Sequence, residues 1–291
     1  MSPGELRERV IAARNADGGW PYYPGRQSRI EPTAWAAIAL GATGSIEPFR
    51  EGVTAFLSAR TRQQGLLVDP GAPAANAGWN GLAVIALHAM QSDVATAAGI
   101  RAALTGLKGI ALRPDDNIRQ DNALQAWPWV QGTFSWVEPT AYCTLALKQG
   151  NLRADDPAVA SRLAEADRLL VDRACRPAGW NYGNSAVLGQ ELEPYVPTTA
   201  LALLALQDRP GEQVVRAGLG WLEEQAASEP ATMALGLAAS CLTVFGRPAD
   251  KAIEGLAVLE QQTGHLDNAH LLSIALFART LGEHGARALR I

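Results

Sequence analysis

The chain lacks most of the features that announce a chemical class. Its three cysteines, Cys143, Cys175 and Cys241, have no paired spacing, so we expect reduced thiols and no disulfide framework. The net charge of −4 gives no basic footprint for nucleic acid. No apolar run reaches membrane-spanning length, and residues 1–14 lack the apolar core of a signal peptide. We therefore expect a cytoplasmic protein with no transmembrane segment.

Motifs for metals and cofactors are missing as well. The sequence holds no His/Cys cluster of metal-binding spacing, no glycine-rich phosphate loop and no nucleophile elbow. We therefore expect neither a metal nor a cofactor. What the chain does have is apolar material: hydrophobic residues make up 48% of it, enough for a core of ordinary size.

One short phrase occurs three times, each time before a run of Ala and Leu. The copies are Glu31-Pro32-Thr33-Ala34-Trp35, Glu138-Pro139-Thr140-Ala141-Tyr142 and Val196-Pro197-Thr198-Thr199-Ala200. Self-similarity of this kind indicates a repeat architecture. Proline suits the first turn of a helix, and a carboxylate is favoured at the positive end of the helix dipole. The phrase therefore predicts where helices begin and places glutamates at two of those beginnings.

The chain alternates between two kinds of helical segment. Six segments are amphipathic, and six are apolar on every side, which requires that they be buried all round. The amphipathic segments are 3–14, 48–61, 93–108, 157–174, 211–227 and 249–262. The apolar segments are 32–42, 78–90, 139–149, 197–207, 230–245 and 268–281. With no stretch that reads as a sheet, the pattern predicts an all-α (α/α)6 toroid of six hairpins. It would form a single domain over residues 1–291, with the apolar helices as its inner ring.

Four connections between outer and inner helices are long and rich in Trp and Tyr. They cover residues 15–31, 62–77, 109–138 and 175–196. Loops of this length are uncommon in a compact domain unless they are functional. All four must emerge at the rim where the inner helices begin, and we expect the functional site there.

Two Gly-x-Trp segments resemble the repeat of the squalene–hopene cyclase and prenyltransferase superfamily. They are Asp17-Gly18-Gly19-Trp20 and Gly179-Trp180-Asn181-Tyr182-Gly183. The resemblance implies a toroid that encloses an apolar cavity for isoprenoid chains. The chain departs from that pattern because it has no Asp-x-Asp-Asp motif and length for only one toroid. Asp267-Asn268-Ala269-His270 resembles the helix that supplies a histidine zinc ligand in protein prenyltransferases, but the other ligands are missing.

Glu138 and Glu31 are the candidate catalytic residues. Burial disfavours the charged form of a carboxyl group, so a buried Glu could act as a proton donor. Glu138 lies between Trp136 and Tyr142 in the sequence, and Glu31 lies near Trp35. Aromatic faces there could stabilise a carbocation. The alternative is that each glutamate only caps its helix.

The candidate substrate-binding residues are mostly aromatic. Four of them cluster in the longest loop, where exposure would be an aggregation liability. The full set is Trp127, Trp129, Phe134, Trp136, Tyr142, Trp35, Trp79, Tyr195, His270 and Asp267. We expect the last two to form a hydrogen-bonded pair, because they lie three residues apart on one predicted helix.

Together these patterns favour a terpene-cyclase-like enzyme that binds an isoprenoid or similar small apolar ligand. It would cyclise or isomerise that ligand by protonation, as a class II terpene cyclase-like isomerase. Two alternatives remain open at this point. One is a non-catalytic toroid that binds an apolar ligand or a partner protein. The other is a carbohydrate-processing toroid, because paired carboxylates and tryptophans also suit sugars. The sequence leaves open whether a second subunit is needed.

Overall fold

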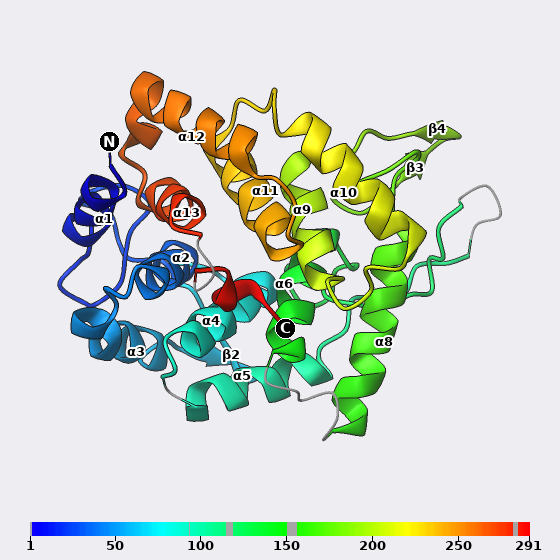
Figure 1. Ribbon diagram of the computed structural model, residues 1–291. Helices are drawn as coiled ribbons and strands as arrows, with labels where there is room; N and C mark the ends of the chain where they lie inside the picture. The colour runs from blue at the N-terminus through cyan, green and yellow to red at the C-terminus, as the bar shows by residue number, and fades with distance from the viewer. Residues whose placement is uncertain (1, 93, 115–118, 150–155, 282–284) are drawn as a thin grey trace.

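The computed structural model describes residues 2–92, 94–114, 119–149, 156–281 and 285–291. Its helices form two concentric rings (Figure 1). The inner helices are α2 (Ile30–Ala42), α4 (Ala77–Ala89), α6 (Val137–Lys148), α9 (Val196–Ala205), α11 (Thr232–Val244) and α13 (Ala269–Arg279). The outer helices are α1 (Pro3–Ala12), α3 (Arg50–Ser58), α5 (Val94–Gly106), α8 (Pro157–Asp172), α10 (Gln213–Gln225) and α12 (Asp250–Thr263). These bounds lie close to the predicted ones.

The inner ring is closed. Each inner helix contacts the next in chain order, from α2 through α4, α6, α9 and α11 to α13, and α13 returns to α2. Each outer helix packs against the inner helix before it in the chain, and α1 packs against α13. The predicted all-α (α/α)6 toroid is therefore confirmed. Each packed hairpin thus consists of an inner helix and the outer helix that follows it in the chain. The sixth pairs α13 with α1, where the ring closes.

Three of the long loops are fixed by the same tryptophan clamp. In each, a fully buried Trp donates its indole N–H to a backbone carbonyl of the preceding outer helix. The pairs are Trp20 with Val10 at 2.6 Å, Trp127 with Leu104 at 2.9 Å and Trp180 with Leu170 at 2.6 Å. The backbone N–H of the same Trp donates to a threonine hydroxyl of the following inner helix: Thr33, Thr140 and Thr199. A threonine of the repeated phrase thus holds each of these three loops.

Each clamped loop also crosses to the neighbouring inner helix. The residue two positions after the Trp accepts a hydrogen bond from the first backbone N–H of that helix, at 2.9 Å in all three cases. The acceptors and donors are Tyr22 and Ala269 of α13, Trp129 and Ala77 of α4, and Tyr182 and Val137 of α6. A helix start has unpaired N–H groups, so these bonds satisfy a real requirement. They fasten adjacent inner helices at the rim.

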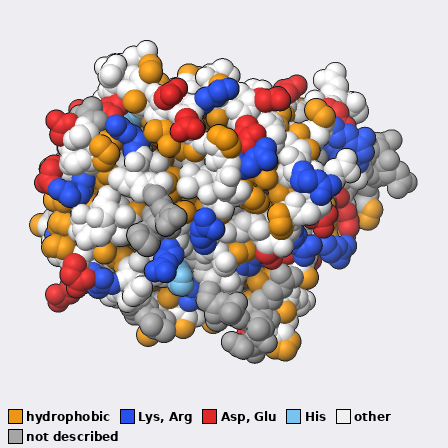
Figure 2. Space-filling model, viewed as in Figure 1, with side chains coloured by type: hydrophobic (Ala, Val, Ile, Leu, Met, Phe, Trp, Pro, Cys, Tyr) orange, Lys and Arg blue, Asp and Glu red, His pale blue; other side chains and the backbone are white. Residues whose placement is uncertain are grey.

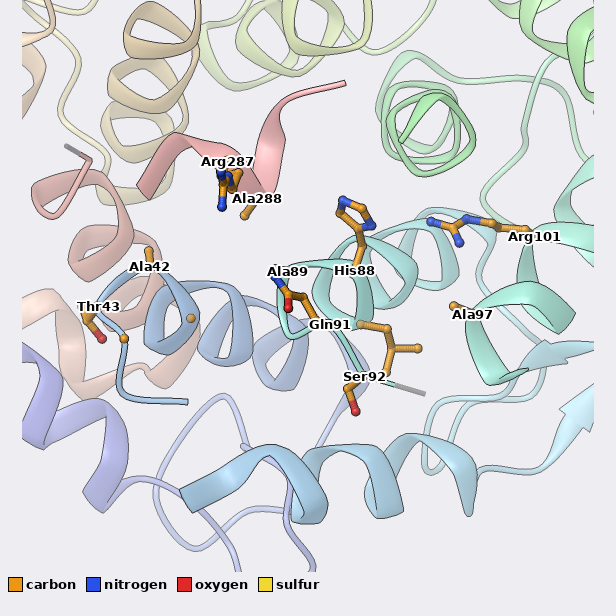
Figure 3. A pocket seen from close by; sticks show the side chains of 13 residues that line it. Ala42, Thr43, His88, Ala89, Gln91, Ser92, Ala97, Arg101, Arg287 and Ala288 are labelled. Carbon is orange, nitrogen blue, oxygen red and sulfur yellow. The ribbon is translucent and has the colours of Figure 1, made fainter. Parts of the chain in front are cut away.

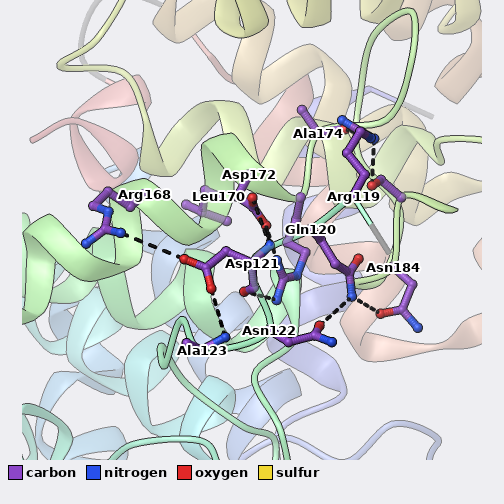
Figure 4. A network of polar contacts seen from close by, with 12 residues as sticks. Arg119, Gln120, Asp121, Asn122, Ala123, Arg168, Leu170, Asp172, Ala174 and Asn184 are labelled. Atoms are coloured by element: carbon purple, nitrogen blue, oxygen red, sulfur yellow. Dashed lines mark hydrogen bonds and ion pairs between the residues drawn. The ribbon is translucent and has the colours of Figure 1, made fainter. Parts of the chain in front are cut away.

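The longest loop is also anchored to α8 by polar contacts (Figure 4). The Asp121 backbone N–H donates to the Asp172 carboxylate at 3.0 Å, and Arg173 donates to the Asp121 carbonyl at 3.1 Å. Arg119 donates to Ser185 Oγ at 2.7 Å and to the Ala174 carbonyl at 3.2 Å. The guanidinium of Arg119 therefore holds the loops of two repeats together.

The presence of strands differs from the sequence-based expectation. The chain forms two short antiparallel hairpins, where no strand was expected: β1 (Arg62–Gln63) with β2 (Leu66–Leu67), and β3 (Ala186–Val187) with β4 (Gln190–Glu191). Both are parts of long loops, too short to show an alternating pattern. Short 3-10 helices η1 (Glu47–Phe49), η2 (Gly264–Asp267) and η3 (Gly285–Leu289) complete the fold.

The C-terminal segment covers the end of the ring opposite the long loops. η3 contacts α2, α4 and α11, and Figure 1 views the molecule onto this face. Gln149 Nε2 donates to the Ala288 carbonyl at 2.7 Å, and Gln207 Nε2 donates to the Leu289 carbonyl at 2.8 Å. Among the described residues, no helix is both long enough and apolar enough to cross a bilayer.

The clamp gives a stability prediction with a matched control on the same helix. Thr140 and Thr144 of α6 are both fully buried, but only Thr140 serves a clamp; Thr144 Oγ1 has no hydrogen-bond partner among the described residues. We expect Thr140→Val to lower the free energy of unfolding by about 1–3 kcal/mol, because it leaves the Trp127 N–H unpaired. Thr144→Val should be neutral or stabilising. Denaturant unfolding measures both, and equal losses would contradict the clamp.

Candidate functional site

The two candidate glutamates lie at the rim of the long loops, in the first turns of their helices. Glu31 is the second residue of α2 and Glu138 the second residue of α6. The charges of both raise the pKa of Tyr142, after burial as the largest cause. Helix α4 stands between α2 and α6 in the ring. Side chains from α2 and α6 can therefore act on one another only across the inside of the ring. Glu31, Glu138 and Tyr142 thus all face this interior, the lumen of the ring.

Glu31 is held by two partners from other elements. The hydroxyl of Tyr22, in the first loop, donates to Glu31 Oε2. His270 Nε2, from α13, lies 3.7 Å from Glu31 Oε1. The rings of Tyr22 and His270 meet edge to face, with 5.9 Å between their centroids. The hydrogen bond from Tyr22 orients the Glu31 carboxylate, and His270 lies on its other side.

His270 is kept in its neutral form by this position. Burial lowers its pKa, and the charge of Glu31 opposes that shift only in part. Its Nε2 atom is buried and makes no hydrogen bond among the residues that the structure describes. The ring of Trp35 lies 6.5 Å from the His270 ring. A buried ring nitrogen beside Glu31 is thus left without a hydrogen bond among the described residues, and such a group usually requires an explanation.

Glu138 has the strongly shifted carboxyl of the site. Burial, and secondarily the charge of Glu31, raises its pKa to about 7. A carboxyl group with this pKa carries a proton for much of the time at neutral pH. Such a carboxyl group is able to donate a proton near neutral pH.

Asp69 belongs to the same cluster and was not among the residues predicted from the sequence. It is 2% exposed, accepts a hydrogen bond from the Ile30 backbone N–H at 2.7 Å and pairs with Arg29. Burial raises its pKa, against these two contacts, and its charge raises the pKa of Tyr22. An alignment of the repeats that places Leu67 at the position of Trp20 would have identified it. Asp69 then takes the position of Tyr22, because each lies two residues further on.

Two pairs of exposed aromatic rings stand beside Glu138. Tyr182 and Tyr195 have ring centroids 5.2 Å apart, and the pKa of Tyr182 is raised by burial and then by the charge of Glu138. Phe134 and Trp136 have centroids 4.6 Å apart, and Trp136 is the N-cap of α6. Tyr182, Tyr195 and Phe134 are at least a third exposed. Flat apolar faces are thus open to solvent near Glu138.

The other predicted aromatics lie deeper or elsewhere. Trp35 and Tyr142 are buried in the lumen, where Trp35 packs on Phe277 with a centroid separation of 6.1 Å. Trp127 is fully buried in its clamp, with the Arg162 guanidinium 4.3 Å from its ring, and no face is left for a ligand. Trp129 and Trp79 are half-buried. The ring of Trp129 packs so closely against Gly78 that a Cβ atom at that position would lie 2.7 Å from the ring.

The predicted pair of Asp267 and His270 is not formed. The Asp267 carboxylate pairs with Arg9 of α1, and its side chain is 78% exposed. The reason is the backbone: Asp267 lies in η2, before α13 begins, with a φ of 50° that turns it away from the helix. Asp267 therefore links the two ends of the chain, while His270 faces Glu31. In the described ranges, no group of three or more His, Cys, Asp or Glu side chains could hold a metal ion.

Comparison with known proteins extends to structure alone. No family model matches the sequence, and no curated protein matches it. Among solved structures, an alpha-amylase from Clostridium perfringens matches with a TM-score of 0.71 at 11% identity, over 96% of this chain and 97% of that one. The type II terpene cyclase MstE from Scytonema matches with a TM-score of 0.57 at 17% identity, over 90% and 78%. The family 8 endoglucanase Cel10 from Klebsiella pneumoniae matches with a TM-score of 0.53 at 14% identity, over 89% and 99%.

These neighbours are α/α toroids, and at such identities they support the fold and not an activity. They place the chain with the toroid proteins in general. They do not support squalene–hopene cyclases in particular.

The raised pKa of Glu138 predicts a pH-dependent stability. An ordinary glutamate has a pKa of 4.5, so the unfolded chain releases this proton at a lower pH than the native state, which holds it up to about 7. Native stability therefore falls as the pH rises through that window. Glu138→Gln has no such proton. The variant should gain on the wild type by up to about 3 kcal/mol across this window. Denaturant unfolding as a function of pH measures the difference.

Glu31→Gln is the companion variant. It removes the repulsion and leaves the burial of Glu138, so the same pH dependence should shrink without vanishing. If wild type and Glu138→Gln gave parallel curves, Glu138 would titrate in the ordinary range.

Proposed function

We propose that this rim is the acid–base site of a carbohydrate-processing enzyme that cleaves glycosidic bonds. The observation that carries the proposal is Glu138, a carboxyl group with a pKa of about 7 beside a second, oriented carboxylate, Glu31. Glycoside hydrolysis uses this combination: one carboxylic acid protonates the leaving oxygen and one carboxylate acts at the anomeric carbon. Glu138 is assigned the first role and Glu31 the second.

The steps use groups already positioned at the rim. Glu138 gives its proton to the glycosidic oxygen as the bond from that oxygen to the anomeric carbon breaks. Glu31 either takes a proton from the attacking water or attacks the anomeric carbon directly, and the configuration of the product reports which. Tyr22 keeps the Glu31 carboxylate oriented in either case, with His270 beside it. Water completes the hydrolysis and Glu138 is reprotonated.

The surroundings suit a sugar better than an isoprenoid. The lumen below the glutamates is occupied by Trp35 and Phe277, which are at most 1% exposed and pack on one another. At the mouth, polar groups of Tyr22, Glu31 and His270 can exchange hydrogen bonds with hydroxyl groups. The exposed rings beside Glu138 offer faces on which a pyranose can lie. Two of the solved neighbours named above are an amylase and an endoglucanase, which agrees with this choice.

A second candidate is the protonation-initiated cyclisation of an isoprenoid. The same proton donor favours it, since Glu138 is flanked by aromatic rings that could face a carbocation. It also has a structural neighbour, the Scytonema terpene cyclase. It would require an apolar substrate to bind above the packed Trp35 and Phe277, with the polar Glu31 cluster beside it.

Leaving-group dependence tests the role of Glu138. On oligosaccharides we expect Glu138→Gln to lower kcat/KM about 10²–10⁴-fold, because general acid catalysis is lost. On dinitrophenyl glycosides the same variant should keep most of its rate, since that leaving group departs without a proton. Glu31→Gln should lose activity on both substrates. Glu223→Gln, in an outer-helix pair with Arg247, is the control and should match the wild type.

The other outcomes assign the site differently. Cyclic products from squalene or prenyl diphosphates that vanish in Glu138→Gln would replace the sugar assignment by the isoprenoid one. Binding of oligosaccharides or isoprenoids without turnover, unaffected by Glu138→Gln, would make the toroid a binding module.

A further inference from the structure

A cavity of about 630 Å³ lies at the end of the ring opposite Glu31 and Glu138 (Figure 3). It is lined by the C-terminal ends of α2 and α4, by α5 and by η3. Three basic side chains line it: His88 from α4, Arg101 from α5 and Arg287 from η3. None of the described residues that line it is acidic. Figure 2 shows basic side chains and a histidine gathered near the middle of this face.

Arg101 has hydrogen-bonding capacity that the described residues do not use. Its Nε donates to the Ala146 carbonyl of α6 at 3.2 Å, which fixes the guanidinium. Its Nη2 is buried and has no hydrogen-bond partner within the described part of the chain. Burial lowers the pKa of Arg101, because the charged guanidinium is less stable away from water. Figure 3 shows the guanidinium directed toward His88.

Comparable basic residues at this end of the ring are neutralised. Lys148 of α6 donates to the Ala205 carbonyl and also pairs with Asp167 and Asp208. Arg279 of α13 pairs with Glu260. Each of these cations thus has a carboxylate partner. Arg101 also donates to a carbonyl near the end of a helix, but it has no carboxylate partner among the described residues. Its bond to that carbonyl uses Nε and therefore does not account for Nη2.

The other two basic groups add to the same field. Because the Arg101 guanidinium is directed toward His88, its charge lowers the pKa of His88, after burial as the larger cause. Arg287 enters the cavity from the C-terminal segment. Thr43 and Ser92 supply hydroxyl groups in the lining. Guanidinium forks and hydroxyl donors around a space of this size suit an oxyanion carried on a small molecule.

We propose that this cavity is a second ligand site, which binds a small molecule through a phosphate or carboxylate group held by Arg101, His88 and Arg287. The ligand would also join η3 to the inner helices α2 and α4, since the cavity lies between them. The proposal does not depend on what the opposite rim catalyses.

Calorimetric titration tests the site without any assay of activity. We expect glucose 6-phosphate and inorganic phosphate to bind in a 1:1 ratio and glucose not to bind; citrate replaces phosphate in a parallel arm to decide between the two oxyanions. Arg287→Ala and His88→Gln should each weaken binding at least tenfold. Arg101→Lys, which keeps the charge but loses the fork, should do the same and is safer for folding than Arg101→Gln.

The matched control is Arg290→Ala, which removes the same charge from the same segment at a residue that does not line the cavity. It should leave the dissociation constant within about twofold of the wild type. Equal weakening by Arg290→Ala and Arg287→Ala would reveal non-specific attraction and overturn the site. The same holds if no anion binds at millimolar concentration, or if Glu138→Gln abolishes binding, since the ligand would then lie at the rim.

Discussion

Six helices that are apolar on every side impose the closed ring on which the rest of the structure depends. Such a helix needs neighbours all round, and the ring gives each one two inner neighbours and an outer helix. Closure brings all six helix N-termini to one rim, where their free N–H groups need partners. The carbonyls of Tyr22, Trp129 and Tyr182 each accept from one of them, and the clamps of Trp20, Trp127 and Trp180 hold the loops that carry these carbonyls. The long loops therefore have a structural role at the rim.

The same geometry sets two opposing effects on Glu138. A helix N-terminus favours a carboxylate by about 0.3–1 kcal/mol, up to about 2 in partly buried places. A rise in pKa from 4.5 to about 7 corresponds to about 3 kcal/mol in the other direction. Burial and the charge of Glu31 therefore outweigh the helix dipole. A glutamate that only capped its helix would show the opposite shift, so the raised pKa supports the proposed role of Glu138 as a proton donor.

Much of this could be predicted from the sequence, because periodicity and the repeated phrase report on local constraints. They located the twelve helices, the ring and the loop-rich rim with Glu31 and Glu138. Contacts between distant segments could not be read in this way. Tyr22 and His270 meet at Glu31 only because α13 closes the ring onto α2, and Asp267 leaves its expected partner because its backbone turns before α13 begins. Trp127 lies in an aromatic cluster, but its repeat position makes it a clamp.

The two ends of the ring carry opposite chemistry for a reason that follows from helix direction. The N-terminal rim presents positive dipole ends and holds Glu31, Glu138 and Asp69. The opposite end presents carbonyl groups and holds basic residues, of which Lys148 and Arg101 both donate to the last carbonyls of a neighbouring inner helix. Carbonyl ends can keep a guanidinium in place, but one carbonyl uses only one of its nitrogens. Arg101 lines the cavity, and an anion that binds there would give it the neutralisation that Asp167 and Asp208 provide for Lys148.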